Sequence, residues 1–347
     1  MTSNELPQSF GDVAELEEFL SRPSEGLVET MSRLEGDVLI LGVAGKMGPT
    51  MARMAVRASQ AAGTSRKVIG VSRFSDPDVQ AALEGQGIQT IRGDLLDREF
   101  VASLPDAPNV VSMAGMKFGA TGNESLTWAM NAYLPAVVCE RFRSGRIVAF
   151  STGNVYGLVP VDGTGSVESD PPRPVGEYAM SCLGRERMYE HFSKTLGIPV
   201  SIVRLNYAVE LRYGVLVDLA QQVLNRTPID LAMGYVNVIW QGDANAMALE
   251  SLEHASSPAN VLNVAGPETL AVRDVVRRLG ELLKTPVEFA GTPATDALLN
   301  NGSRGHELYG PPSISSERML EWIAEWVGKG GALLGKPTHF ESRDGRF

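Results

Sequence analysis

A short apolar run that ends in three evenly spaced glycines constrains this chain more than any other feature. Val38–Leu41 is followed by Gly42, Gly45 and Gly48, and a helical pattern extends from residue 50 to about residue 62. We interpret the stretch as a strand, a tight turn and a helix. The first glycine lets the chain turn, the second lets a ligand approach the backbone, and the third lets the helix pack on the strand.

The amino-terminal end of the predicted helix is suited to a pyrophosphate. Its N–H groups and the helix dipole favour an anion, and Pro49 fits the first helical turn because its missing N–H costs nothing there. Ordinary glycine-rich turns show the same spacing, so the turn does not identify a dinucleotide site by itself. The residues of the turn that we predict to bind a cofactor are Gly42, Gly45, Lys46, Met47 and Gly48.

The composition limits the classes of partner and compartment. The chain has 347 residues, of which 44% are apolar and 21% charged, with a net charge of −10. These values fit a globular protein of one large and one smaller domain, and they make nucleic acid and anionic membranes unexpected partners. The two cysteines, Cys139 and Cys182, give no disulfide framework and indicate a reducing compartment. The acidic N-terminus lacks a signal-peptide core, and no apolar run could span a bilayer, so we expect the cytoplasm.

The end of the second predicted strand bears on the choice between NAD and NADP. The run from residue 67 to residue 71 ends in Ser72 and Arg73, where a dinucleotide-binding fold meets the adenine ribose. A cation there suits a 2′-phosphate, so NADP is favoured over NAD. Two alternatives stay open. Arg73 could be a solvated charge at a strand end, and Asp76 lies nearby and could serve NAD.

Two later stretches are the most specific of the chain. A strand from residue 146 delivers the hydroxyl groups of Ser151 and Thr152 at its carboxyl end, within Ser-Thr-Gly-Asn-Val-Tyr-Gly. Ligands sit at that end of the strands in open α/β sheets. Tyr178 then opens a helix that carries Cys182. With the glycine spacing, these stretches make residues 37–330 resemble the extended short-chain dehydrogenase/reductase family, of the NAD-dependent epimerase/dehydratase type.

The resemblance implies a catalytic pair of hydroxyl groups. Aligned on the Val-Tyr-Gly of residues 155–157, the family's strand-end hydroxyl falls on Thr152, with Ser151 as the second choice. The family's helix pattern is Tyr-x-x-x-Lys. Tyr178 is present in this chain, but Cys182 holds the lysine position. A tyrosine and a lysine four residues apart share one helix face, where the ammonium favours the phenolate.

The missing lysine leaves three possibilities. Arg185, on the same helix face, or Lys117, from a neighbouring loop, could supply the cation. Tyr178 could instead act as a proton donor or hydrogen-bond anchor, which needs no lowered pKa, since a free tyrosine titrates near ~10. The third possibility is an inactive site in a protein that only binds nucleotide.

The resemblance also assigns contacts to the cofactor and the substrate. Beyond the glycine turn and the ribose residues, the implied cofactor contacts are Asp94, Leu95, Ala114, Gly115, Lys117 and Tyr178. The loop with Lys117 is similar to the matching loop of UDP-galactose 4-epimerase, in which a lysine contacts the dinucleotide. Asn131, on a helix predicted from about residue 124 to residue 143, matches the family's asparagine that supports the active-site backbone. The predicted substrate contacts are Lys117, Asn154, Asn206 and Arg212.

The expected fold is α/β, with a Rossmann-type doubly wound parallel sheet and a smaller C-terminal substrate domain. Residues 37–205 and about 235–265 would form the dinucleotide-binding domain, and residues 206–234 and 266–347 the substrate domain. Apolar spacing within residues 1–36 predicts two short amphipathic helices, packed on the main body or on a second subunit of a homodimer. We also predict helix N-caps at Asp97 and Asp243 and a core position for Trp240.

The leading functional prediction is an NAD(P)-dependent oxidoreductase that acts on a hydroxyl or ketone of a sugar-like substrate. Thr152 and Tyr178 would polarise the reacting oxygen. The first alternative is an epimerase or dehydratase, in which bound cofactor returns the hydride to the same substrate. The second is a catalytically silent nucleotide-binding sensor. This alternative stays open because Cys182 holds the position of the family's lysine. The four histidines are too scattered along the chain to indicate a metal site.

Overall fold

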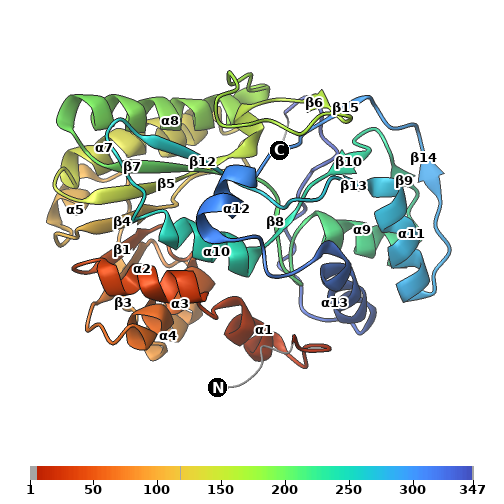
Figure 1. Ribbon diagram of the computed structural model, residues 1–347, viewed down its shortest axis with the longest axis horizontal. Coiled ribbons are helices and arrows are strands. Elements are labelled where there is room, and N and C mark those ends of the chain that lie inside the picture. The colour runs from red at the N-terminus through yellow and green to blue at the C-terminus, as the bar shows by residue number, and fades with distance from the viewer. Residues whose placement is uncertain (1–5, 118, 346–347) are drawn as a thin grey trace.

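A seven-stranded parallel sheet, with the strand order β12-β7-β5-β4-β1-β2-β3, forms the larger lobe of the computed structural model (Figure 1). The structure describes residues 6–117 and 119–345. The sheet strands are β1 (Val38–Leu41), β2 (Val68–Ser72), β3 (Gln89–Arg92), β4 (Asn109–Ser112), β5 (Arg146–Thr152), β7 (Val200–Leu205) and β12 (Asn260–Val264). After β1 the chain builds outward through β2 and β3, and it then returns to the other side of β1 as β4. That reversal makes the carboxyl ends of β1 and β4 the place where this fold class binds ligands.

Helices cover both faces of the sheet, as the alternation along its strands requires. Val38 and Ile40 enter the core on one face, with α2 (Glu25–Arg33), α3 (Gly48–Ala61) and α10 (Gln241–Glu250). Leu39 and Leu41 enter the core on the other, with α5 (Arg98–Ser103), α7 (Leu134–Arg141) and α8 (Gly176–Leu196). Successive strand side chains point to opposite faces, so a fully apolar strand must be covered twice. Figure 1 shows α7 and α8 above the sheet and α2 and α3 below it. The helix α4 (Pro77–Gly85) links β2 to β3.

The helix predicted over residues 124–143 is not continuous. It consists of α6 (Glu124–Trp128), a π-helical turn η1 (Ala129–Tyr133) and α7. π-helical turns within helices are often found at functional sites. The turn carries Asn131, whose place in the site is described below.

The smaller lobe packs three long helices around its own core. These are α9 (Val215–Leu224), α11 (Val272–Leu283) and α13 (Ser316–Gly328), and Trp322 and Trp326 are both buried among them. The remaining short elements of the chain are β6 (Val159–Pro160), β8 (Ala208–Val209), β9 (Ile229–Asp230), β10 (Tyr235–Val236), β11 (Ile239–Trp240), β13 (Leu270–Ala271), β14 (Phe289–Ala290), β15 (Asp296–Ala297), α12 (Ser303–Tyr309) and the 3-10 turn η2 (Gly153–Val155). Of these, η2 contacts α8, and α12 contacts β12 and α10. The exact division of the chain into domains stays a prediction.

Two N-terminal helices pack on the main body, which confirms that part of the prediction. The first, α1 (Val13–Leu20), buries Leu16 and Leu20 in the core of the smaller lobe. The rings of Phe10 and Phe19 lie with their centroids 5.1 and 5.6 Å from that of Trp322. The second, α2, contacts α3 and α10. The N-terminal residues thus join the two lobes from below in Figure 1.

Local predictions at three positions have clear outcomes. Asp97 caps α5 through the N–H groups of residues 99 and 100, as expected. Trp240 is 2% exposed, which confirms its core position. The predicted N-cap at Asp243 is wrong, because α10 already begins at residue 241. The Asp243 carboxylate instead accepts hydrogen bonds from the N–H and hydroxyl of Ser313.

Candidate active site

The three glycines of the turn between β1 and α3 differ in what surrounds them. Gly42 has a φ of +89°, and a Cβ there would lie 2.8 Å from the backbone of Ala114. A Cβ on Gly48 would lie 2.0 Å from the carbonyl oxygen of Val43. A Cβ on Gly45 would meet only the oxygen of Gly42, at 3.2 Å. Protein packing therefore explains the first and third glycines, whereas Gly45 leaves open space against which a ligand can lie.

A cavity of about 520 Å³ opens over this turn at the carboxyl ends of the strands. Nearly all of the predicted site residues line it. They are Gly42, Gly45, Lys46, Met47, Ser72, Arg73, Asp94, Leu95, Ala114, Gly115, Lys117, Ser151, Thr152, Asn154, Tyr178 and Asn206. Gly48 and Arg212 are not among the lining residues. One sheet edge thus gathers residues that are up to 164 positions apart in the sequence (206 − 42 = 164).

Thr152, at the end of β5, is hydrogen-bonded to the phenol of Tyr178. Tyr178 lies in the first turn of α8. The Thr152 hydroxyl also accepts a hydrogen bond from the N–H of Asn154, at 3.2 Å. Burial raises the pKa of Tyr178 well above its usual value, and the neighbouring Cys182 raises it further, while Arg185 and the hydrogen bond with Thr152 lower it. The phenol is therefore protonated at neutral pH in the absence of bound ligands.

Ser151, the second choice for the catalytic hydroxyl, faces a buried ion pair. Its hydroxyl donates to a carboxylate oxygen of Glu186 at 2.5 Å. Glu186 is fully buried and pairs with Arg204 at 2.7 Å. Disturbing one member of a buried ion pair is costly in stability. The hydrogen bond from Ser151 to Glu186 therefore has a structural role at the end of the strand. Thr152 is the better placed of the two hydroxyl groups.

Two cations lie near Tyr178. Arg185 donates to the carbonyl oxygen of Phe150 at 2.7 Å and to the side-chain oxygen of Asn131. The ammonium of Lys117 lies 6.0 Å from the centre of the Tyr178 ring and 3.5 Å from the carbonyl oxygen of Thr338. Burial lowers the pKa of Lys117 to about 8. Arg185 is thus fixed within the wall, whereas Lys117 reaches the ring from a loop.

Asn131 holds the loop that carries Lys117. Its side-chain oxygen accepts from the N–H of Met116 at 2.9 Å, and its amide nitrogen donates to the carbonyl oxygen of Met116 at 2.9 Å. The same nitrogen donates to the hydroxyl of Ser181, one residue before Cys182, at 2.9 Å. The π-helical turn therefore ties the loop after β4 to α8.

The two residues that could select NADP or NAD lie differently with respect to the cavity at the end of β2. Arg73 is exposed and lines the cavity beside Ser72. Asp76 is the N-cap of α4, accepts a hydrogen bond from the N–H of Asp78 at 3.0 Å, and is not among the lining residues. The carboxylate that would serve NAD is thus engaged elsewhere.

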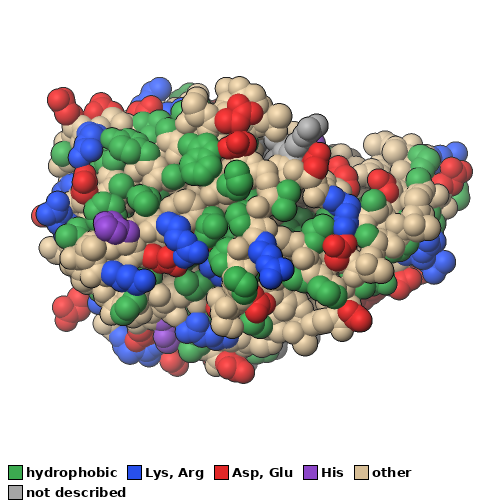
Figure 2. Space-filling model, turned by 90° about the horizontal axis from the view of Figure 1, so that it is seen from above, with side chains coloured by type: hydrophobic (Ala, Val, Ile, Leu, Met, Phe, Trp, Pro, Cys, Tyr) green, Lys and Arg blue, Asp and Glu red, His purple; other side chains and the backbone are tan. Residues whose placement is uncertain are grey.

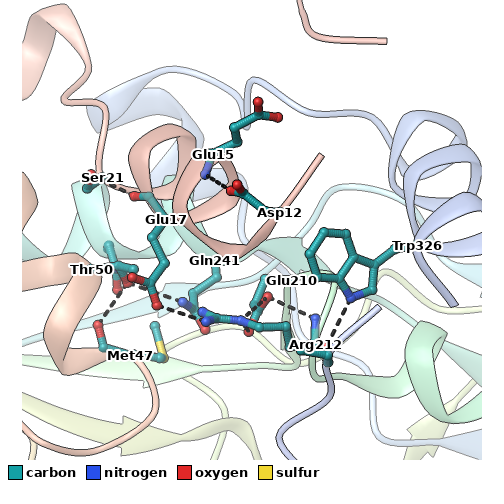
Figure 3. A network of polar contacts seen from close by, with 12 residues as sticks. Asp12, Glu15, Glu17, Ser21, Met47, Thr50, Glu210, Arg212, Gln241 and Trp326 are labelled. Carbon is teal, nitrogen blue, oxygen red and sulfur yellow. Dashed lines mark hydrogen bonds and ion pairs between the residues drawn. The ribbon is translucent and has the colours of Figure 1, made fainter. Parts of the chain in front are cut away.

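Two predicted substrate contacts have partners within the protein. The amide of Asn206 donates to the side-chain oxygen of Asn237 at 2.6 Å, although Asn206 still lines the cavity. Arg212 pairs with Glu17 at 2.8 Å and with Glu210 at 3.1 Å. Figure 3 shows Glu17 and Glu210 turned toward it. Arg212 therefore links α1 to the smaller lobe and is not among the residues that line the cavity.

Of the wall that the smaller lobe contributes, sequence reasoning identified Tyr213 as a residue that could face the cleft, but it missed the residues that follow and the carboxyl-terminal segment. Tyr213, Gly214 and Val215 line the cavity from the start of α9, and Lys336 and Thr338 line it from the carboxyl-terminal segment. The N–H and hydroxyl of Thr338 both donate to Asp218, at 2.8 and 2.6 Å. That segment is polar and turn-rich, with no apolar periodicity, so the sequence offered no signal that it closes the site.

A second cavity, between the end of α9 and the segment before β14, has a volume of only about 40 Å³. Figure 2 shows acidic and basic side chains interspersed over one face. Among the described residues, no helix combines the length and apolar character of a membrane span. The described residues also contain no cluster of three or more His, Cys, Asp and Glu side chains that could hold a metal ion.

Several solved structures share this fold. UDP-glucose 4-epimerase from Thermotoga maritima, solved with UDP-glucose, matches with a TM-score of 0.68 and 16% identity over 85% of this chain and 99% of that chain. UDP-glucuronic acid 4-epimerase from Bacillus cereus matches with a TM-score of 0.69 and 17% identity over 84% and 99%. A dTDP-glucose 4,6-dehydratase from Streptomyces venezuelae matches with a TM-score of 0.71 and 18% identity over 84% and 97%. At such identities the likeness shows the fold alone.

The family of this chain is identified by a match between its sequence and a family model. No curated protein matches the chain. The model of the NAD dependent epimerase/dehydratase family matches residues 38–209, which run from β1 through β8 and include the glycine turn, Thr152 and Tyr178. The family description names NAD, in keeping with the nicotinamide cofactor expected from the sequence. Through these residues the chain belongs to the NAD dependent epimerase/dehydratase family, within the extended short-chain dehydrogenases/reductases that it resembles.

Proposed function

We propose that this protein transfers a hydride between a nicotinamide cofactor and a hydroxyl or ketone carbon of a small sugar-like substrate. The observation that carries the proposal is the meeting of Thr152 and Tyr178 in the cavity that also contains the glycine turn. When bound, the cofactor supplies the hydride donor or acceptor. The protein's own side chains then have to bind the substrate oxygen and manage one proton.

The protonated phenol of Tyr178 defines how that proton moves. A phenol that is protonated at neutral pH can donate to an oxygen that gains negative charge, as happens when a ketone is reduced. Thr152 supplies a second hydrogen bond to the same oxygen. In the oxidative direction the phenolate must form, and Lys117 and Arg185 are the cations that would stabilise it.

The walls of the cavity fit a dinucleotide, and NADP is our preferred choice. The open space at Gly45 and the start of α3 would take the pyrophosphate, and Asp94 and Leu95 would contact the adenine. Arg73 faces the cavity at the ribose end, whereas Asp76 caps a helix. Among the predicted substrate contacts we retain Lys117, Asn154 and Asn206, and we leave out Arg212 because two carboxylates outside the cavity hold it.

Internal return of the hydride is the second candidate function. The family match and the epimerase and dehydratase neighbours favour it. In that case the cofactor stays bound, and no net reduced cofactor accumulates during turnover. The two candidate functions use the same site. They differ in whether the hydride stays on the released product or cofactor or returns from the bound cofactor to the same substrate.

The test is a screen of sugars and sugar derivatives with wild-type protein and Tyr178→Phe. Absorbance of reduced cofactor reports net redox, and chromatography of the products reports epimers or dehydrated sugars. Tyr178→Phe should lower turnover by about 10²–10⁴-fold, because the proton donor is lost while the ring remains. The dissociation constant of the cofactor should stay within about twofold.

Tyr133→Phe is the matched control, since Tyr133 is 44% exposed on η1 and does not line the cavity. It should turn over at the wild-type rate. Full activity of Tyr178→Phe would end this assignment. A protein that binds NADP or NAD tightly but converts none of the substrates would favour the silent nucleotide sensor.

A further inference from the structure

The segment after α13 joins the smaller lobe to the start of α8. Its beginning is held by a hydrogen bond from the N–H of Leu334 to the carbonyl oxygen of Arg212, at 3.0 Å. Further on, Phe340 is buried in the core of the smaller lobe. Its end packs against the residue before α8, because a Cβ on Gly345 would lie 2.1 Å from the carbonyl oxygen of Val175. The two residues of this segment that line the cavity, at positions 336 and 338, lie between those anchors.

Thr338 is the residue through which this segment enters the candidate site. It is 1% exposed, and its N–H and hydroxyl both donate to one carboxylate oxygen of Asp218, on α9, at 2.8 and 2.6 Å. Its carbonyl oxygen accepts a hydrogen bond from the ammonium of Lys117 at 3.5 Å. One residue thus connects a carboxylate of the smaller lobe with a lysine of the sheet lobe, and Asp218 fixes the position of the carbonyl oxygen that the lysine binds.

The charge of Asp218 acts on the same lysine. Burial lowers the pKa of Lys117 to about 8, whereas Cys182 and Asp218 raise it. Burial raises the pKa of Cys182, so its thiol is neutral at neutral pH and contributes little to this effect. Burial also raises the pKa of Asp218, but the two hydrogen bonds from Thr338 lower it and so favour the carboxylate. Asp218 is therefore an acid that keeps the ammonium of Lys117 charged.

We propose that Asp218 is a positioning residue for the proposed hydride transfer and acts through Thr338 and Lys117. By holding Thr338, it keeps the ammonium of Lys117 beside the phenol of Tyr178, 6.0 Å from the centre of the ring. Asp218 is not among the residues that line the cavity, so it does not act by touching the substrate. The inference rests on the proposed function, in which the ammonium stabilises the phenolate.

The first experiment measures the reactivity of Lys117 and needs no substrate. Wild-type and variant proteins are labelled with trace acetic anhydride between pH 6 and pH 10, and mass spectrometry reports the acetylation of Lys117. At pH 10 the labelling rate should rise by about two- to tenfold in Asp218→Ala, because loss of the hydrogen bonds that fix Thr338 releases the lysine. In Asp218→Asn the amide oxygen can still accept from Thr338, so the rate at pH 10 should stay close to that of wild type.

The same titration tests the charge of Asp218. The pH of half-maximal labelling should lie near 8 in wild type and fall by at least about 0.5 in Asp218→Asn, because a neutral amide does not favour the ammonium. Lys46, Tyr178 and Cys182 also face Lys117, and they are unchanged in this variant. A purely structural role of Asp218 would leave the pH of half-maximal labelling where it is in wild type.

The second experiment is a double-mutant cycle on turnover in the oxidative direction, with NADP and the best substrate of the sugar screen. Asp218→Ala should lower kcat by about tenfold or more and change KM by less than about twofold, because the cation beside the phenol is displaced. Added to Lys117→Met, it should lower kcat by less than about twofold further, since it acts through a lysine that is already removed. Asp218→Asn should keep most of kcat at neutral pH.

Asp243→Ala is the matched control. Asp243 also accepts hydrogen bonds from the N–H and hydroxyl of a single residue, Ser313, and it is not among the residues that line the cavity. The variant loses the same kinds of hydrogen bond, so its labelling of Lys117 and its kcat should match those of wild type. Thermal unfolding of each variant shows whether it is folded. If Asp218→Ala does not fold, the labelling titration of Asp218→Asn decides.

Two results would overturn the inference. One is that Lys117 is labelled in both Asp218 variants as it is in wild type. The other is that the double variant loses the product of the two single losses in kcat, because Asp218 would then act independently of Lys117. Failure of the proposed function looks different: wild type would convert no sugar, while the labelling of Lys117 would still depend on Asp218.

Discussion

The ammonium of Lys117 lies 6.0 Å from the centre of the Tyr178 ring, although the two residues belong to different elements. The family pattern would place the cation four residues after the tyrosine, where this chain has the fully buried Cys182. Asn131 fixes the loop of Lys117 through both backbone groups of Met116. We infer that Lys117, from the loop after β4, joins Arg185 of α8 as a cation of this site.

Lys117→Met should therefore lower turnover in the oxidative direction by about tenfold or more, because a nearby cation shifts a phenol's pKa by roughly one to three units. The limb of the pH–rate profile that belongs to Tyr178 should move to higher pH, since the phenolate loses its stabilising charge. Cys182→Ala is the matched control, because a neutral thiol stabilises no phenolate, and it should change turnover by less than about threefold. Equal losses in both variants would contradict the placement of the cation on Lys117.

Arg73 is expected to decide the choice of cofactor. Arg73→Ala should raise the dissociation constant of NADPH by about 10–100-fold and leave that of NADH nearly unchanged, since a charge-assisted contact to the 2′-phosphate is worth roughly 1.5–3 kcal/mol. Fluorescence titration with the two reduced cofactors measures both constants. Asp76→Asn is the control, because Asp76 caps α4 outside the cavity. If both cofactors weaken equally, the preference for NADP loses its basis.

Substitutions at Gly45 and Gly48 test separately whether each glycine makes room for the dinucleotide or for neighbouring atoms of the protein. Gly45→Val should abolish binding of the dinucleotide while the free energy of unfolding stays close to that of wild type, because a Cβ there meets only one protein atom, at 3.2 Å. Gly48→Val should destabilise the fold, since its Cβ would lie 2.0 Å from the oxygen of Val43. Urea unfolding and cofactor titration of both variants measure the two effects. A Gly45→Val protein that binds cofactor as wild type does would make this glycine purely structural.

The sheet and the turn were predictable because their signals are local. An apolar run of four residues between a charged residue and a glycine predicts a buried strand, and each predicted strand lies within a residue or two of the observed one. The strand-end residues then meet automatically, because parallel strands present their carboxyl ends on one edge. Thr152 lies at such a strand end, whereas Tyr178 lies on α8 and was paired with Thr152 through the resemblance to the family.

The wall from the smaller lobe was not predictable, because it depends on contacts between distant segments. Arg212 carries the charge expected of a substrate contact, but an ion pair with Glu17, 195 positions away, holds it elsewhere. Lys336 and Thr338 belong to a segment without periodicity, which long-range contacts such as that between Thr338 and Asp218 hold at the site. The π-helical turn at Asn131 likewise has no signal in the apolar pattern of its helix.

A buried carboxyl between the N-terminal helices and the sheet lobe gives the last prediction. Glu250, on α10, is 3% exposed, and its carboxylate accepts a hydrogen bond from the hydroxyl of Ser24, the N-cap of α2, at 2.6 Å. Burial raises the pKa of Glu250 from 4.5 to about 7, and the charges of Asp243 and Glu253 raise it further. The folded state therefore binds more protons than the unfolded state between these two pKa values.

The free energy of unfolding should consequently fall as pH rises from 5 to 8, by up to about 3 kcal/mol from this group. Glu250→Gln keeps an oxygen that can accept from Ser24 but cannot ionise, so it should flatten this slope and be more stable than wild type at pH 8. Urea unfolding at pH 5, 6, 7 and 8 measures both effects. Glu253→Gln should shrink this slope without removing it, because the charge of Glu253 makes only part of the rise in the pKa of Glu250. An unchanged slope in Glu250→Gln would show that Glu250 is not the group that titrates.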